Sequence, residues 1–467
     1  MRQRLAPLLP LVCAVAVTLA CWLDSPSFLR GARRHQGGWQ WHYNAQPLHP
    51  LALARSVASF AALAFLLRHL DRTNGRRRSG VLLQCVSALA LALGVVSLTR
   101  FGNRNPAIPL TAHELSTAAT GYFDTLARFP DIGRVFREWP ALRKELALPH
   151  GPYQPPFAIV PAWSSYRLMS AWPELALWLT RVTATRRLSP SVTYAAAGFG
   201  SALLSLAACA LTPLFAVALL RDREEPEAIA VAAIGAAIPA LLVHTPTIYQ
   251  VLTPLFTATA LVAQRARSPF GALASGCLVG VVAELSFLAL ALGNVVATQI
   301  AVRGGGARVR LLAALVIGTL LALGGAQAAT GFSWSDGLFA ILSEQLPEDV
   351  LHRGYGAGLL RNAIDVVVWC GPLPALGAAF GGIRAVAALL RHEPVDGLAL
   401  GLLVGLSVLA LSGAVRAEAG RLWMPYFPLI VIASVPTLRT LLPGRWLWLG
   451  AACQLVHAWA LVVRWGS

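Results

Sequence analysis

The longest polar stretch of an otherwise apolar chain spans residues 120–163 and opens on an acid that could do chemistry. Asp124 follows Tyr122 and Phe123, so its carboxylate lies beside aromatic rings of the kind that bind the face of a sugar. A carboxylate in such a place can take the proton of a reacting hydroxyl as a general base. The alternative is structural, because Asp124 could instead cap a helix or pair with Arg128 at a membrane interface.

The same stretch closes on a stiff aromatic corner around two consecutive prolines. Pro155 and Pro156 each fix one φ angle and force an extended turn, with Tyr153 and Phe157 on either side. Such a corner can shape a binding surface, or it can simply be the turn at the start of a helix. His150 lies just before it and could contact a ligand, although a single loop histidine is more often incidental.

Two later polar segments combine arginine, acid and aromatic residues. Arg353 and Tyr355 belong to the first segment, and Arg416, Glu418 and Arg421 belong to the second. The planar guanidinium group donates two hydrogen bonds at once, which suits a phosphate. These arginines fall on the predicted outer side, against the positive-inside tendency, and so suggest an anionic lipid headgroup. The alternatives are snorkelling at the interface and internal pairing, such as Arg421 with Glu418.

Acids at the membrane-embedded ends of helices also require an explanation. An ionised carboxylate at membrane depth costs about 2.5–3.5 kcal/mol on insertion scales. Five acids lie at predicted outer helix ends, namely Asp24, Asp124, Glu284, Asp365 and Glu418. Asp124 is the preferred candidate for chemistry because it begins the large polar stretch, and Asp24 in its Asp-Ser-Pro turn is the second choice.

Composition predicts the environment in which these residues work. The chain has 467 residues, of which 56% are hydrophobic and 13% charged, and its mean hydropathy is +0.62. A soluble protein would carry about 25% charged residues. Apolar runs of bilayer length recur throughout, which predicts an all-α polytopic membrane protein rather than a barrel.

The net charge of +17 comes almost entirely from arginine. These arginines flank apolar segments, as the positive-inside rule describes, and do not form a basic patch with aromatics, so nucleic-acid binding is not expected. No CxxC spacing occurs among the seven cysteines, and we expect neither a metal site nor a disulfide framework. No cofactor is indicated, and a divalent metal stays open.

The apolar runs predict about thirteen transmembrane helices in one integral membrane domain over residues 1–467. The N-terminus is expected inside, because the cluster of arginines at 76–78 follows the second span. The predicted outer loops cover residues 24–50, 100–190 and 330–361, and short interfacial helices are expected in the largest. The predicted spans are 1–23, 51–70, 81–99, 191–220, 228–243, 249–263, 270–282, 285–302, 311–329, 364–390, 397–415, 423–441 and 446–463.

The order of these features resembles the first outer loop of the GT-C-fold glycosyltransferases. Protein O-mannosyltransferases and lipid A aminoarabinose transferases place a catalytic acid after a helix and a Lys/His-Pro-Pro-Leu motif about thirty residues later. The matching positions are Asp124 and residues 154–157, with Gln154 in place of the Lys or His and Asp124-Thr125 in place of paired acids. The later segments, residues 353–372 and 418–423, look like those of uncharacterised bacterial relatives.

The resemblance implies transfer of a sugar from a polyprenyl-phosphate donor to a glycan, lipid or protein acceptor at the outer face of the cytoplasmic membrane. Asp124 would then be the base, and Arg353, Arg421 and Arg416 would hold the donor phosphate. A lipid-linked donor accounts for a chain without a nucleotide-binding domain. The substrate-binding candidates are Tyr122, His150, Tyr153, Gln154, Tyr355 and Glu418.

Two other classes of function remain open at this point. A transporter or flippase of lipid-linked saccharides should show inverted repeats and interrupted helices with ionisable residues near the midplane. A polymerase or ligase of lipid-linked saccharides would depend on a large loop late in the chain, whereas the largest loop here is early.

Overall fold

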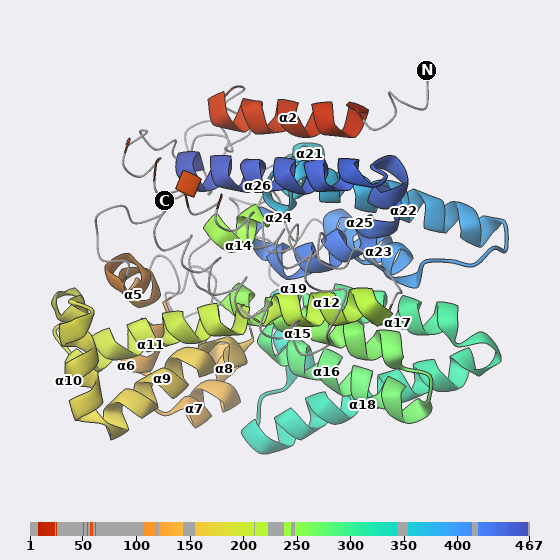
Figure 1. Cartoon of the computed structure of the whole chain (residues 1–467). Helices are drawn as coiled ribbons and strands as arrows, with labels where there is room; N and C mark the ends of the chain where they lie inside the picture. The colour runs from red at the N-terminus through yellow and green to blue at the C-terminus, as the bar shows by residue number, and fades with distance from the viewer. Residues whose placement is uncertain are drawn as a thin grey trace, which may run out of the picture.

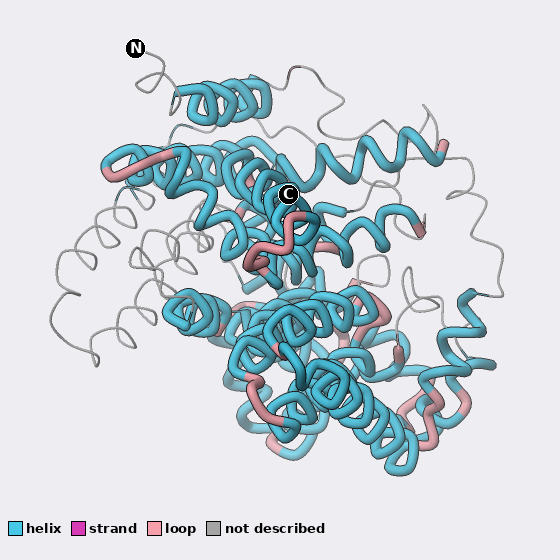
Figure 2. Tube along the Cα trace, turned by 90° about the vertical axis from the view of Figure 1, so that its right-hand side faces the viewer, coloured by secondary structure: helices cyan, strands magenta, loops and turns pink. Residues whose placement is uncertain are grey.

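The computed structural model is helical throughout the residues that it describes. No strand occurs among them, and the connections that the structure describes between helices are short (Figure 2). The predicted spans over residues 51–70 and 81–99 and the arginines at 76–78 lie outside the described part. The structure describes residues 8–23, 25, 50, 54, 57–58, 61, 107–116, 121–142, 155–209, 211–222, 238–243, 248–342, 354–412 and 419–465.

Long apolar helices run in a common direction across the molecule (Figure 1). Among the described residues, five segments are long and apolar enough to cross a membrane, namely Val192–Cys209, Gly305–Thr330, Pro372–Leu390, Met424–Leu441 and Trp446–Trp465. The shorter apolar helices are α2 (Leu8–Leu23), α16 (Pro269–Leu285), α17 (Ala289–Arg303) and α23 (Gly397–Leu411). Among the described residues, these helices confirm the predicted all-α class, and their length and composition suit a multi-pass membrane protein.

The remaining helices complete the bundle and its ends. The long ones are α11 (Val192–Cys209), α12 (Thr212–Asp222), α15 (Ile248–Arg265), α18 (Arg308–Thr330), α21 (Tyr355–Cys370), α22 (Pro372–Leu390), α25 (Phe427–Leu441) and α26 (Arg445–Trp465). The short ones are α14 (Pro239–Val243), α19 (Trp334–Leu342), α24 (Ala419–Leu422) and the 3₁₀ turn η7 (Met424–Tyr426).

The described part of the large loop over residues 100–190 forms short helices, as expected. They are α5 (Ala107–Leu115), α6 (Tyr122–Arg128), α7 (Ile132–Arg137), α8 (Trp139–Leu142), η4 (Pro156–Ile159), α9 (Val160–Ala171), α10 (Pro173–Val182) and η5 (Thr185–Leu188). Figure 1 shows α5, α6 and α10 together at the left-hand side, at one end of the long helices.

Two of the predicted spans are wrong, because each is divided into two helices. The predicted span 364–390 is two helices, because Gly371 adopts φ 108° and Pro372 starts α22. Only glycine takes such a φ readily, and proline cannot continue the preceding helix. The predicted span 191–220 is likewise divided into α11 and α12. The described part of the predicted outer loop 330–361 includes α19 and the start of α21.

Among the described helices, α16 and α18 share the most extensive contact. A Cβ at Gly276 would collide with the Leu315 carbonyl oxygen, and a Cβ at Gly318 would collide with that of Leu273. The Thr319 hydroxyl donates across the pair to the Gly276 carbonyl at 3.2 Å. Gly276 and Gly280 form a G-x-x-x-G motif, which lets helix backbones approach where lipid supplies no hydrophobic drive.

The connections predicted to be inside gather at one end of the bundle. Arg303 in α17 donates a short hydrogen bond to the backbone carbonyl of Gln264 in α15. Gly397, at the start of α23, lies against Gln299 of α17, where a Cβ would be 3.0 Å from the Gln299 Cα. Figure 1 shows the α17–α18 and α22–α23 connections on the right-hand side, where α2 also begins.

A buried acid ties the large loop to the bundle. Glu114 of α5 is 1% exposed, and its Oε2 accepts a hydrogen bond of 2.7 Å from the Ser201 hydroxyl of α11. Burial raises the pKa of Glu114 from 4.5 to about 8, and the hydrogen bond from Ser201 offsets part of that rise. The acid is therefore held in its protonated form where α5 docks.

We expect the stability of the protein to fall as pH rises because of Glu114. Its folded-state pKa lies above its unfolded value, so its contribution is complete below about pH 4.5 and is lost as pH rises through about 8. Thermal unfolding in detergent between pH 5 and pH 9 would measure this, and Glu114→Gln should flatten the profile. Glu174→Gln on the exposed face of α10 is the matched control. An unchanged slope in Glu114→Gln would contradict the assignment.

Candidate outer-end site

The double-proline turn packs against the predicted outer loop over residues 330–361 through aromatic rings. Phe157 lies 4.6 Å from Phe136 and 6.5 Å from Phe332, measured between ring centroids. Trp334 extends the group, with its ring 5.5 Å from that of Phe287. The η4 turn also packs against α16. These contacts join two loops that are more than 160 residues apart in the sequence, and the sequence analysis places both on the outer side.

Two tyrosines and one tryptophan fix this junction to the ends of helices. The Trp334 indole N–H donates to the Ala283 carbonyl at 2.9 Å, near the end of α16. The Tyr426 hydroxyl donates to the carbonyl of Leu288 at 2.6 Å, just before α17. Tyr355, a predicted substrate contact, donates to the Leu411 carbonyl at 2.6 Å and is exposed. We use the name outer junction for Phe157, Phe332, Trp334 and Tyr426 together with the helix ends that they contact.

Glu284 is a buried acid at the outer junction and follows directly after Ala283. It is 4% exposed, and among the described residues neither of its carboxyl oxygens has a hydrogen-bond partner. Glu284 is one of the acids that the sequence predicts at outer helix ends, but it is not among the predicted site residues. A buried polar group without a partner is costly, and ionisable residues retained inside membrane proteins usually mark function.

We expect replacement of Glu284 by methionine to stabilise the fold. Leaving a buried polar group unsatisfied costs about 1–3 kcal/mol, and Glu284→Met removes that cost at similar side-chain length. The thermal unfolding midpoint should therefore rise, and it should rise less in Glu284→Gln, which keeps a polar group. A lower midpoint in Glu284→Met would show that the carboxyl group has a stabilising partner.

A second polar group lies inside the bundle at α21 and α24. Arg361 and Asp365 form an ion pair with Nε and Oδ1 2.9 Å apart, and their side chains are 6% and 4% exposed. The other Asp365 oxygen accepts from the Gly420 backbone N–H at 3.4 Å. Arg421, a predicted phosphate contact, follows Gly420 and is buried, and Asn362 is buried on α21. The two late segments that carry the resemblance are therefore in contact.

Close packing explains why glycine precedes Arg421. A Cβ at Gly420 would collide with Cδ1 of the Trp369 ring and would lie 2.7 Å from the indole nitrogen. At the far end of α21, Gln454 of α26 donates to the Cys370 carbonyl at 2.9 Å. The ring Nε2 of His457 lies 2.8 Å from the Val368 carbonyl oxygen. The break at Gly371 is thus covered by side chains of the last helix.

Asp124 lies in the first turn of α6 and is partly buried. The N-cap of that helix is Gly121, with φ 64°, so Asp124 is not itself the cap. A carboxylate in the first helical turn is favoured by the helix dipole. The preceding residue, Phe123, is buried and packs edge-on against Tyr194, with centroids 5.9 Å apart. Tyr122 is also buried, which leaves little of its ring exposed for a sugar.

The structure places Asp124 and Arg421 in different helix clusters. α6 packs against α5 and α9, whereas α24 packs against α21. Figure 1 shows α6 and α24 in separate parts of the fold. A substrate contacted by both residues would have to extend between the two clusters. The other predicted site residues lie outside the described part of the chain, namely His150, Tyr153, Gln154, Arg353, Arg416 and Glu418.

Comparison with protein-family models, with curated proteins and with solved structures finds no match for this chain. Within the described residues, no group of three or more His, Cys, Asp and Glu side chains could hold a metal ion. The candidate site is therefore interpreted from its own residues. They are the buried acid Glu284, the buried Arg361–Asp365 ion pair and the aromatic rings at which the two predicted outer loops meet.

Proposed function

We propose that this chain transfers a sugar from a polyprenyl-phosphate donor to an acceptor hydroxyl at the outer face of the cytoplasmic membrane. In this account it has about thirteen transmembrane helices in a GT-C-like arrangement, with the N-terminus inside. The sugar, the acceptor class and the length of the lipid are left open. The partners are a lipid-linked saccharide, its acceptor and membrane lipids.

One observation supports the proposal most strongly, and it concerns the short segment of residues 419–426. Its first part lies against the buried Arg361–Asp365 pair through Gly420, and its last residue, Tyr426, is bonded to the outer junction. The segment therefore joins a buried ion pair, with Arg421 directly after Gly420, to the place where the two outer loops converge. A phosphate held near Arg421 would lie between these two features.

The proposed reaction requires one proton transfer and one displacement. The acceptor oxygen forms a bond to the anomeric carbon while the bond from that carbon to the phosphate oxygen breaks. The polyprenyl phosphate leaves with the electron pair, and Asp124 takes the hydroxyl proton. Arginine near the departing phosphate stabilises the charge that develops there, which is usually the larger contribution to the rate.

We expect Arg421→Gln to weaken binding of a polyprenyl-phosphate sugar by about tenfold or more, since hydrogen bonds to charged groups contribute about 1.5–3 kcal/mol each. Binding of a radiolabelled donor to protein in nanodiscs would measure the effect. Arg310→Gln is the control, because Arg310 is an exposed arginine in the first turn of α18. Equal donor affinity in Arg421→Gln and wild type would remove Arg421 from the site.

A flippase for lipid-linked saccharides is the second candidate. The division of α21 from α22 at Gly371 favours it, because interrupted helices line the transport sites of many carriers. A flippase would bind the donor and move it between leaflets without releasing polyprenyl phosphate. Product analysis therefore separates the two functions.

A further inference from the structure

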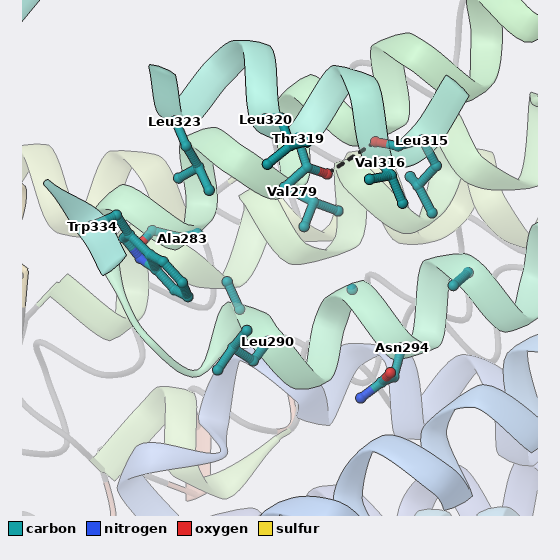
Figure 3. A pocket seen from close by; sticks show the side chains of 13 residues that line it. Val279, Ala283, Leu290, Asn294, Leu315, Val316, Thr319, Leu320, Leu323 and Trp334 are labelled. Carbon is teal, nitrogen blue, oxygen red and sulfur yellow. Dashed lines mark hydrogen bonds between the residues drawn. The ribbon is translucent and has the colours of Figure 1, made fainter. Parts of the chain in front are cut away.

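An apolar groove runs between α17 and α18, with α16 as its floor (Figure 3). Its volume is about 300 Å³, at the lower end of the roughly 300–1,000 Å³ typical of small-molecule sites. Ala289, Gly293 and Ala297 line the α17 side. Their spacing of four residues keeps them on one helix face, so they line the groove along about two turns.

The polar atoms of the groove walls are mostly occupied within the protein. The Thr319 hydroxyl is within hydrogen-bonding distance of the Gly276 and Leu315 carbonyls. The Trp334 indole N–H donates to Ala283, as described above. Asn294 supplies the remaining polar side chain. The groove therefore presents mainly hydrocarbon and small residues to an occupant.

The groove opens toward the surface that would face lipid. The segment containing α18 is the least buried of the five candidate spans. On its wall of the groove, Val316 is 55% and Leu320 is 61% exposed, and Leu290 on the opposite wall is 51% exposed. A concave apolar surface in a bilayer forfeits dispersion contacts unless hydrocarbon fills it.

We propose that this groove binds one acyl chain of a phospholipid from the surrounding membrane. The chain lies along Gly293 and its small neighbours, and the headgroup lies near Trp334, at the outer mouth of the groove. Tryptophan is enriched at the headgroup level of membranes. A bound chain would brace α17 against the α16–α18 pair. This inference depends on the membrane-spanning architecture and not on sugar transfer.

Photolabelling in lipid tests the site directly. Wild-type protein is placed in nanodiscs of phosphatidylcholine that carry a small fraction of acyl-chain diazirine lipid, illuminated, and mapped by mass spectrometry. We expect labelling of residues 289–297 to be about tenfold above that of Leu9 and Val12, two highly exposed positions on α2. A tenfold ratio corresponds to about 1.4 kcal/mol of preference over bulk lipid.

Groove-filling variants supply the second comparison. Gly293→Leu should reduce the labelling of α17 to the level of α2, and the variant should fold because a Cβ there meets only Val279, at 3.7 Å. Ala297→Leu is a second filling variant. Gly324→Leu is the matched control, since no atom lies within 4 Å of a Cβ at that position.

Two results would overturn the inference. Wild-type labelling of α17 no higher than that of α2, or unchanged labelling in both filling variants, would show that the groove holds no preferred chain. Loss of labelling when polyprenyl phosphate is added at a few mole per cent would show that the carrier lipid, not a phospholipid, occupies the groove. Retained labelling under that competition supports the phospholipid.

Discussion

Gly276→Leu is expected to prevent stable folding of the protein. The two helices α16 and α18 approach so closely that even a Cβ at Gly276 would meet the Leu315 carbonyl oxygen, and it would lie 2.9 Å from the Thr319 nitrogen. These are backbone atoms in the middle of a helix and cannot rotate away. Overpacking usually costs about 1–3 kcal/mol, and a backbone collision of this kind belongs at or above the upper end.

The measurement is the yield of monodisperse protein after extraction in detergent, followed by thermal unfolding of whatever is recovered. Gly276→Ala should already lower the unfolding midpoint, and Gly318→Leu should act like Gly276→Leu. Gly324→Leu, on the open face of α18, should leave yield and midpoint near wild type. Wild-type yield from Gly276→Leu would mean that the two helices are further apart than the structure places them.

Asp365→Ala is expected to be the second most damaging substitution. It leaves the Arg361 guanidinium buried without its carboxylate and removes the acceptor of the Gly420 N–H. Breaking a buried ion pair by deleting one partner costs about 3–5 kcal/mol. We expect the unfolding midpoint to fall sharply and the α21–α24 contact to loosen.

The control for Asp365→Ala replaces both partners. In the double variant Arg361→Met, Asp365→Leu, apolar side chains replace the ion pair, and such replacements are often neutral or stabilising. A recovered midpoint with lost donor binding would show that the pair is retained for function. Equal midpoints for wild type and Asp365→Ala would show that the ion pair contributes little.

The sequence predicts the helical membrane architecture well because hydropathy reports directly on the cost of exposing polar backbone to lipid. The described helices α2, α15, α16, α17, α18, α23, α25 and α26 fall on predicted spans. The breaks at Gly371 and near Thr212 were missed, because hydropathy does not register a local change of φ or a proline in a first turn. The pattern Gly371-Pro372 is the signal that could have identified the first of them.

The candidate site was only partly predictable. Residues 353–372 and 418–423 were each predicted from the sequence as site segments. Their contact through Asp365 and Gly420 depends on how α21 packs, which no local sequence pattern predicts. The sequence predicts Glu284 at an outer helix end, but its burial without a hydrogen-bond partner among the described residues depends on the tertiary packing around the end of α16. The G-x-x-x-G motif at Gly276 was present in the sequence and was overlooked.

The separation of Asp124 from Arg421 bears most directly on the proposed mechanism. It leaves two possibilities, since the substrate either extends between α6 and α24 or is handled by residues of only one cluster. If residues of one cluster alone handle the substrate, Glu284 at the outer junction is a described acid that could serve as the base instead of Asp124. Comparison of Glu284→Gln with Asp124→Asn in one assay separates these possibilities.

The most direct test of the account is a transfer assay with the purified protein in lipid. A panel of radiolabelled polyprenyl-phosphate sugars would be supplied with membrane acceptors, and released polyprenyl phosphate would be measured for wild type, Asp124→Asn and the exposed control Asp336→Asn. The account predicts release by wild type and Asp336→Asn, with a loss of about 10²–10⁴-fold in Asp124→Asn. Donor binding without any release would contradict glycosyl transfer, and wild-type release by Asp124→Asn would contradict the assignment of the base.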